Sequence, residues 1–303
     1  MNDLQLQNST IATAVSEAFP FSVDKFPLSG PDAMKSPHYG LFRSDNSECT
    51  GRAVKKGYVP HQTGDVIALV QAAQTVFDSG ECSVKCHWRD GHYVSVAPSN
   101  DVRKEMYGGK DAVFPRIIIR AGYDGQAFKA TLGLFRDACR NLEMLRNVGG
   151  TTTTIRHNSN LPDKMEELVA QFSTLEGGWD SVQKYIDRMT EERVLLSSFL
   201  EHLYPTPAEN ASGNTQTRHR NTIELIVRRV IKEQRELGIP TDGQTMKDFK
   251  VDAWMAWNGV QGYVQHDKSR KGENTGDFRR ALLAAEDKVV ISAGDYLHNL
   301  IAV

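Results

Sequence analysis

Two Asp-Gly turns, each between segments of alternating polarity, constrain the fold of this chain most. CSVKCHWRDGHYVSVAPS (82–99) has Asp90-Gly91 between two such segments, and FPRIIIRAGYDGQAFKATLGLF (114–135) has Asp124-Gly125 between two more. Asp-Gly is favoured in tight β-hairpin turns because both residues tolerate positive φ. The sequence therefore predicts two hairpins within one mainly antiparallel sheet.

Helical periodicity surrounds these hairpins. Thr63 or Asp65 can cap a helix whose apolar side chains recur from Val66 to Phe77. We also expect a short helix at 11–19, an extended arm anchored by aromatic residues and broken by prolines at about 20–40, a helix at 137–148 and a strand at 151–156. The fold class that follows is α+β, with packed helices beside a mainly antiparallel sheet.

The second half of the sequence reads as helices separated by one polar segment. PTPAENASGNTQTRHRN (205–221) is rich in helix breakers and is the best candidate for a linker. We therefore expect an α+β core with an N-terminal arm at 1–204, a linker at 205–221 and a helical C-terminal region at 222–303. Trp254 and Trp257 lie three residues apart and are expected in the core. Asn258 and His266 also share a helical face, and we expect structural roles for them.

Composition narrows the class of protein. The 303 residues are 40% hydrophobic and 24% charged, and the formal net charge is −2. The sequence has neither an apolar run of about 18 residues nor a signal peptide, so we expect a cytoplasmic protein without a membrane partner. Cys82, Cys86, His87 and His92 are close enough in sequence to consider zinc. Strand alternation, however, places the cysteines in an apolar row and His87 in the opposite polar row, which favours core cysteines.

Basic residues gather between Arg116 and His157, although the whole chain is almost neutral. Local positive charge with nearby aromatic residues is typical of a surface that binds nucleic acid, since cations contact phosphates and bases stack on rings. The alternative for each residue is an ordinary solvated position on a strand or helix. The predicted DNA-binding residues are Lys55, Lys56, Tyr58, Arg116, Arg120, Tyr123, Lys129, Arg136, Arg140, Arg146, Arg156 and His157.

A second basic run lies within the helical region. Arg228, Lys232 and Arg235 share one helical face, and Glu224 can pair with Arg228 at a spacing of four residues. We interpret this run as a solvated helix face. The sequence has no G-x-x-x-x-G-K-[ST] motif, so ATP-driven chemistry of that type is not expected.

Several blocks resemble the phage- and plasmid-borne family called domain of unknown function 932. They are GRAVKKGYVPHQTGDVIALVQAA (51–73), HWRDGHYVSVAPS (87–99), AGYDGQAFKATLGLFRDACRN (121–141), TIRHN (154–158) and DAWMAWNGVQGYVQHDK (252–268). The blocks follow the family's order. In the last block the family often has Asn-Ala-Val-Thr-Glu, where this chain has Asn258 to Gly262, so the acidic residue is missing. The resemblance implies a role in the DNA metabolism of mobile elements.

A remoter similarity, at the level of the fold, links this strand-rich arrangement to single-strand annealing proteins of the RecT and Rad type. Together these features predict a phage-type protein that binds single-stranded DNA and anneals strands in recombination or replication. It would act as a homo-oligomer, in a ring or filament, without ATP, cofactor, metal or catalytic residues. The alternatives are a module that binds a host defence or replication protein and, more remotely, a metal-dependent nuclease.

Overall fold

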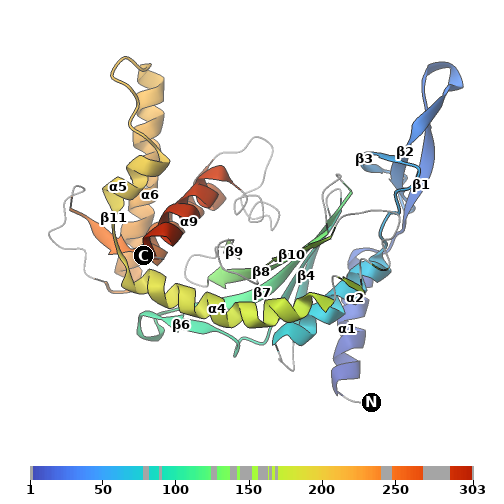
Figure 1. Cartoon of the computed structure of the whole chain (residues 1–303), viewed down its shortest axis with the longest axis horizontal. Coiled ribbons are helices and arrows are strands. Elements are labelled where there is room, and N and C mark those ends of the chain that lie inside the picture. The colour runs from blue at the N-terminus through green and yellow to red at the C-terminus, as the bar shows by residue number, and fades with distance from the viewer. Residues whose placement is uncertain are drawn as a thin grey trace. The chain divides into compact units, whose positions relative to one another are not determined.

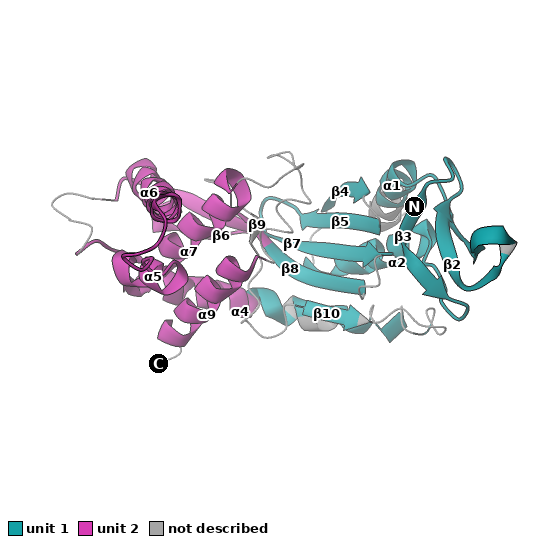
Figure 2. Ribbon diagram, turned by 90° about the horizontal axis from the view of Figure 1, so that it is seen from above, with its two compact units in different colours: residues 1–102, 115–133, 150–179 teal, residues 103–114, 134–149, 180–303 magenta. Residues whose placement is uncertain are grey.

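The chain folds into two compact units built from interleaved segments. A computed structural model describes residues 3–77, 82–88, 91–123, 128–136, 142–143, 152–155, 163, 166–167, 170–239, 248–268 and 287–301. Unit 1 comprises residues 1–102, 115–133 and 150–179, and unit 2 comprises 103–114, 134–149 and 180–303 (Figure 2). Strands β7 (Asp111–Gly122) and β8 (Phe128–Arg136) and helix α4 (Phe172–Glu191) contribute residues to both units.

The sheet strands of unit 1 follow the order β10-β8-β7-β5-β4, with β4 at Cys82–Trp88, β5 at Gly91–Pro98 and β10 at Thr152–Ile155. β4 and β5 pair antiparallel from Cys82 opposite Pro98 to Trp88 opposite His92, which confirms the first hairpin. β7 and β8 are neighbours, as the second hairpin requires. Arg89-Asp90 and residues 124–127, which join these strands, lie outside the described residues. The α+β class is confirmed.

Two helices of unit 1 pack against each other, α1 (Asp3–Ala18) and α2 (Thr63–Gln74), the latter followed by a short 3-10 turn at Thr75–Phe77. The predicted apolar stripe of α2 is confirmed, because Val66, Leu69, Val70 and Ala73 are buried. The helix cap differs from the expectation. Gln62 occupies the N-cap position, and its backbone N–H donates to Asp65 Oδ2 at 2.7 Å.

The expected extended arm is a separate three-stranded antiparallel sheet of β1 (Val23–Ser29), β2 (Lys35–Arg43) and β3 (Cys49–Lys55). A short turn at Pro31–Ala33 joins β1 to β2, and these two strands form a ribbon that extends away from α1 and α2 (Figure 1). Pro27 lies in β1, an edge strand, where the missing N–H of proline is tolerated. The prolines thus exclude helix without excluding a strand.

Unit 2 is mainly helical. Its helices are α5 (Leu196–Leu203), α6 (Gly213–Glu236), α7 (Ala253–Gly262), a π-helical turn (Tyr263–Asp267) and α9 (Lys288–Ile301). Its short elements are β6 (Lys104–Met106), a 3-10 turn (Tyr107–Gly109), β9 (Leu142–Glu143), β11 (Arg193–Leu195) and β12 (Lys250–Asp252). Every residue of α7 is buried, which confirms the core positions of Trp254 and Trp257.

Two secondary-structure predictions in this part of the chain are wrong. α6 begins at Gly213, inside the expected linker, because Ser212 caps it by accepting a hydrogen bond from Thr215 N. Leu142 and Glu143, expected in a helix, form β9 and pair with Phe135 and Leu134 of β8. The remainder of that predicted helix, 137–141 and 144–148, lies outside the described residues.

Candidate nucleic-acid interface

The main sheet of unit 1 has two chemically different faces, and the strand register assigns residues to each. Cys86 lies opposite Val94, which lies opposite Ile119, and this apolar row marks one face. Trp88 and His92 of the same face contact Phe19, which follows α1. Since side chains alternate along a strand, the intervening residues belong to the other face.

That other face is basic. Its strand positions are Ser83, Lys85 and His87 on β4, Tyr93 and Ser95 on β5, Arg116, Ile118 and Arg120 on β7, Lys129 and Thr131 on β8, and Thr152 and Thr154 on β10. Lys129 is assigned to it because the ring of its neighbour Phe128 contacts His61, 4.6 Å away on the apolar face. The ionisable side chains at these positions are four cations, one histidine and one tyrosine. We call this set the basic face: Lys85, His87, Tyr93, Arg116, Arg120 and Lys129.

Cations and rings alternate across the basic face. The Arg120 guanidinium lies 5.7 Å from the ring centroid of Tyr93, whose ring lies 6.4 Å from that of His87. Lys85 is exposed, His87, Arg116, Arg120 and Lys129 are half-buried, and the Tyr93 ring is buried beneath them. Burial lowers the pKa of the Arg116 guanidinium to about 10, so this side chain stays charged at neutral pH. The face therefore carries positive charge in a partly desolvated setting, where ionic contacts are stronger than in water.

Three of the predicted DNA-binding residues meet on this face, namely Arg116, Arg120 and Lys129. Sequence reasoning missed Lys85, His87 and Tyr93 as members of the same surface. The polar row of β4 was visible in the sequence. Its alignment with Arg120 depends on the pairing of β4 with β5 and of β5 with β7, which only the tertiary structure provides.

Two predicted DNA-binding residues are in the wrong place for that role. Tyr123 is fully buried, its ring stacks on His61 at 4.1 Å, and its hydroxyl donates to the His61 backbone carbonyl. Arg136 is also fully buried, with Nε 2.6 Å from Asp111 and Nη1 2.7 Å from Glu233 within unit 2. Their side chains serve the core of each unit. Arg140, Arg146, Arg156 and His157 lie outside the described residues.

The remaining predicted residues, Lys55, Lys56 and Tyr58, lie at the end of β3. Lys55 and Lys56 are exposed and Tyr58 is half-buried. The Lys25 ammonium donates to the backbone carbonyls of Lys56 and Tyr58 at 2.6 and 2.7 Å. This lysine therefore ties the end of β3 to β1, while Lys55 and Lys56 present their charges to solvent.

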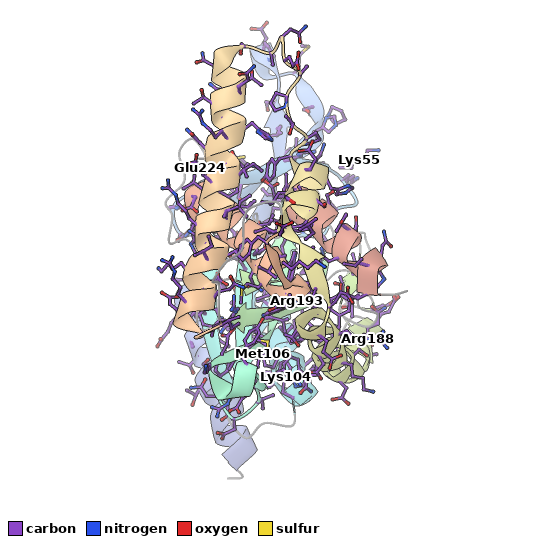
Figure 3. The ribbon with its side chains drawn as sticks, turned by 90° about the vertical axis from the view of Figure 1, so that its left-hand side faces the viewer. Lys55, Lys104, Met106, Arg188, Arg193 and Glu224 are labelled. Atoms are coloured by element: carbon purple, nitrogen blue, oxygen red, sulfur yellow. The ribbon has the colours of Figure 1, made fainter. Side chains whose placement is uncertain are left out.

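The second basic run follows the predicted ion-pairing pattern. On α6, Arg228 Nη2 lies 3.4 Å from Glu224 Oε2, and both side chains are exposed (Glu224 is labelled in Figure 3). Lys232 Nζ lies 3.7 Å from Glu236 Oε1. Arg229 donates through Nε and Nη2 to the two carboxylate oxygens of Asp267. In α7, the Asn258 side-chain amide donates to the Trp254 carbonyl at 2.9 Å. These contacts support the interpretation of α6 as a solvated face and of Asn258 as structural.

The geometry also bears on metal chemistry. Cys86 and His92 belong to the apolar face, whereas His87 points to the opposite one, so these candidate zinc ligands diverge. Burial raises the pKa of the Cys86 thiol to about 11, which disfavours the thiolate that zinc requires. In the part of the chain that the structure describes, no three His, Cys, Asp or Glu residues form a group able to hold a metal ion. None of the described helices has the length and apolar character needed to span a membrane.

Among known proteins, neither the curated proteins nor the solved structures give a match to this chain. The model of one protein family, described as a domain of unknown function (DUF932), matches residues 52–285. This region contains β4, β5, β7, β8 and β10, and with them every residue of the basic face. The match covers well over half of the sequence, and the chain therefore belongs to the DUF932 family.

Proposed function

We propose that this protein binds single-stranded DNA on the basic face of unit 1, and that several copies on one strand promote annealing without ATP. The observation that carries the proposal is the set of four cations on one face of adjacent strands, with the half-buried ring of His87 among them. A sequence-tolerant single-strand site needs both components, because phosphates require cations and unpaired bases require rings on which to stack.

The arrangement favours a strand over a small anion. Lys85 on β4 and Lys129 on β8 lie on opposite sides of β5 and β7, so the cations extend across four strands. Neighbouring strands are about 4.8 Å apart, and the row is therefore about 14 Å wide. That width spans two or more phosphates of an extended single strand.

Salt dependence tests the phosphate contacts. Binding of a fluorescent single-stranded oligonucleotide should weaken as salt rises, and Lys85→Gln should reduce the slope of log affinity against log salt by about 0.7. Lys85 is suitable because it is exposed, so its replacement leaves the core intact. Lys184→Gln changes an exposed lysine of α4 and serves as the matched control. It should keep the original slope.

Annealing and assembly need their own measurements. Complementary oligonucleotides should pair faster in the presence of the protein without nucleotide, and the native mass should increase when single-stranded DNA is added. A chain that shows no salt-dependent binding of single-stranded DNA would overturn the whole proposal. A stoichiometric host protein captured without DNA would then favour the protein-binding alternative.

A further inference from the structure

The β1–β2 ribbon carries an aromatic pair, Phe26 and Phe42, which we call the platform. Phe26 on β1 pairs with Gly40 on β2, and the rings of Phe26 and Phe42 lie 5.9 Å apart in an edge-to-face contact. The Phe42 ring covers Gly40, since a Cβ at that position would come within 2.6 Å of it. A larger residue at position 40 would therefore displace the Phe42 ring from this position.

This platform is open to solvent. Phe26 is 52% exposed, although phenylalanine is among the residues most often buried. Among the described residues, the large hydrophobic side chains that are exposed are Phe26, Met34, Val59, Leu225 and Leu300, and the first two belong to the ribbon. Isolated exposed side chains are common, but a solvent-facing ring that packs on a second ring is a formed surface.

Positive charge lies beside the platform. His38 and Phe42 are on the same side of β2 as Gly40, because each is two residues away, and Lys55 of β3 lies opposite His38. Lys55 therefore shares the Phe26 side of the ribbon and is exposed there (Figure 3 labels it). Lys35, Arg52 and Lys56 add exposed cations to this three-stranded sheet. Its exposed acids are Asp24, which lies opposite Phe42, Asp32 in the β1–β2 turn, and Asp45 and Glu48, which pair with Arg43.

We propose that the ribbon is a second single-strand contact, in which Phe26 stacks on one unpaired base and Lys55 contacts a neighbouring phosphate. This inference rests on the proposed function and adds a base-reading element to it. A ring beside a cation is the combination that holds a base and its backbone together. Stacking on a base also gives a reason for the Phe26 ring to lie outside the core.

Oligonucleotides with and without bases test this directly. Phe26→Ala should weaken binding of a normal single-stranded oligonucleotide about fivefold or more, the lower end of what one stacked base contributes. The same variant should bind an oligonucleotide of abasic sites as well as the unmodified protein does. Phe26→Trp should restore binding, and a 2-aminopurine probe should be quenched by the Trp variant and by the unmodified protein but not by Phe26→Ala. Leu225→Ala, an exposed apolar residue of α6, is the matched control and should change nothing.

The outcomes separate this inference from the proposed function. If the unmodified protein binds single-stranded DNA and Phe26→Ala binds it equally well, the ribbon proposal is wrong and the basic face remains. An equal loss on normal and abasic oligonucleotides would also overturn it, since stacking requires a base. If instead Phe26→Ala lowers the native mass without DNA, or abolishes binding to anionic vesicles, the platform contacts a second copy or a lipid surface.

Discussion

His61 Nε2 and His92 Nδ1 lie 3.0 Å apart in the fully buried core of unit 1. One of these nitrogens must donate a proton and the other must accept it, so the contact requires at least one neutral imidazole. The pair lies between Tyr123, which stacks on His61, and Phe19, whose ring lies 4.6 Å from His92. This arrangement ties α2 and its preceding loop to the sheet.

The histidine pair predicts acid sensitivity. Burial, with a smaller contribution from the charge of Arg43, lowers the pKa of His92 to about 3 from its usual 6.5. The unfolded chain therefore binds a proton below pH 6.5 that the folded chain refuses, and stability falls as pH falls. Through this group, the free energy of unfolding should drop by about 1.4 kcal/mol for each pH unit below 6.5.

Urea titrations of the protein and of His92→Gln at pH 7.5 and 5.0 measure this loss of stability. The variant should lose less stability between the two pH values, whereas His38→Gln, at an exposed position, should behave like the unmodified protein.

The buried position of Arg136 predicts a large effect of its removal. Arg136→Met leaves Asp111 and Glu233 buried without their cation, so the free energy of unfolding should fall by about 3–5 kcal/mol. Arg228→Met breaks an exposed pair with Glu224 and should change it by no more than about 0.5 kcal/mol. Denaturant unfolding of both variants makes the comparison. Equal effects would contradict the buried ion cluster.

Two helical glycines should respond to alanine with opposite signs. A Cβ on Gly259 of α7 would come within 2.5 Å of Val230 on α6, so Gly259→Ala should destabilise unit 2 by about 1–3 kcal/mol. A Cβ on Gly177 of α4 has open space around it, so Gly177→Ala should stabilise by about 0.5–1 kcal/mol through higher helix propensity. Thermal unfolding measures both. A stabilised Gly259→Ala protein would show that α6 and α7 are not in close contact.

Gly51 in β3 lies at the junction between the two sheets of unit 1, where β3 contacts Tyr123. Its φ is +73°, and an added Cβ would lie 2.2 Å from the carbonyl oxygen of Tyr123, which accepts a hydrogen bond from Arg52 N. Gly51→Ala should therefore lower the free energy of unfolding by at least about 2 kcal/mol. Gly57→Ala has no neighbour within 4 Å and should change it little. Hydrogen exchange at Arg52 N should increase only in the Gly51 variant.

Local sequence patterns account for the secondary-structure elements that were predicted correctly. The β4–β5 hairpin follows from alternation and the Asp-Gly pair, and the buried stripe of α2 follows from its period. The helix predicted at 137–148 illustrates the limit. Leu142 and Glu143 have helical periodicity around them, yet they pair with β8, because an adjacent strand edge competes with local propensity. In the expected linker at 205–221, residues 205–212 are not helical, but α6 begins at Gly213, because Ser212 caps it despite the polar composition around it.

The sequence by itself determined the class of fold, the family and the region where basic residues gather. These depend on turn pairs, periodicity and composition, which are properties of neighbouring residues. Only the tertiary structure decided which cations belong together. It placed Arg120 beside Tyr93 and Lys85 on the same face, but it buried Arg136 against Asp111 and Glu233. The physical reason is that a basic side chain has the same charge on a surface as in a core, and burial and partners are set by strand register and helix packing.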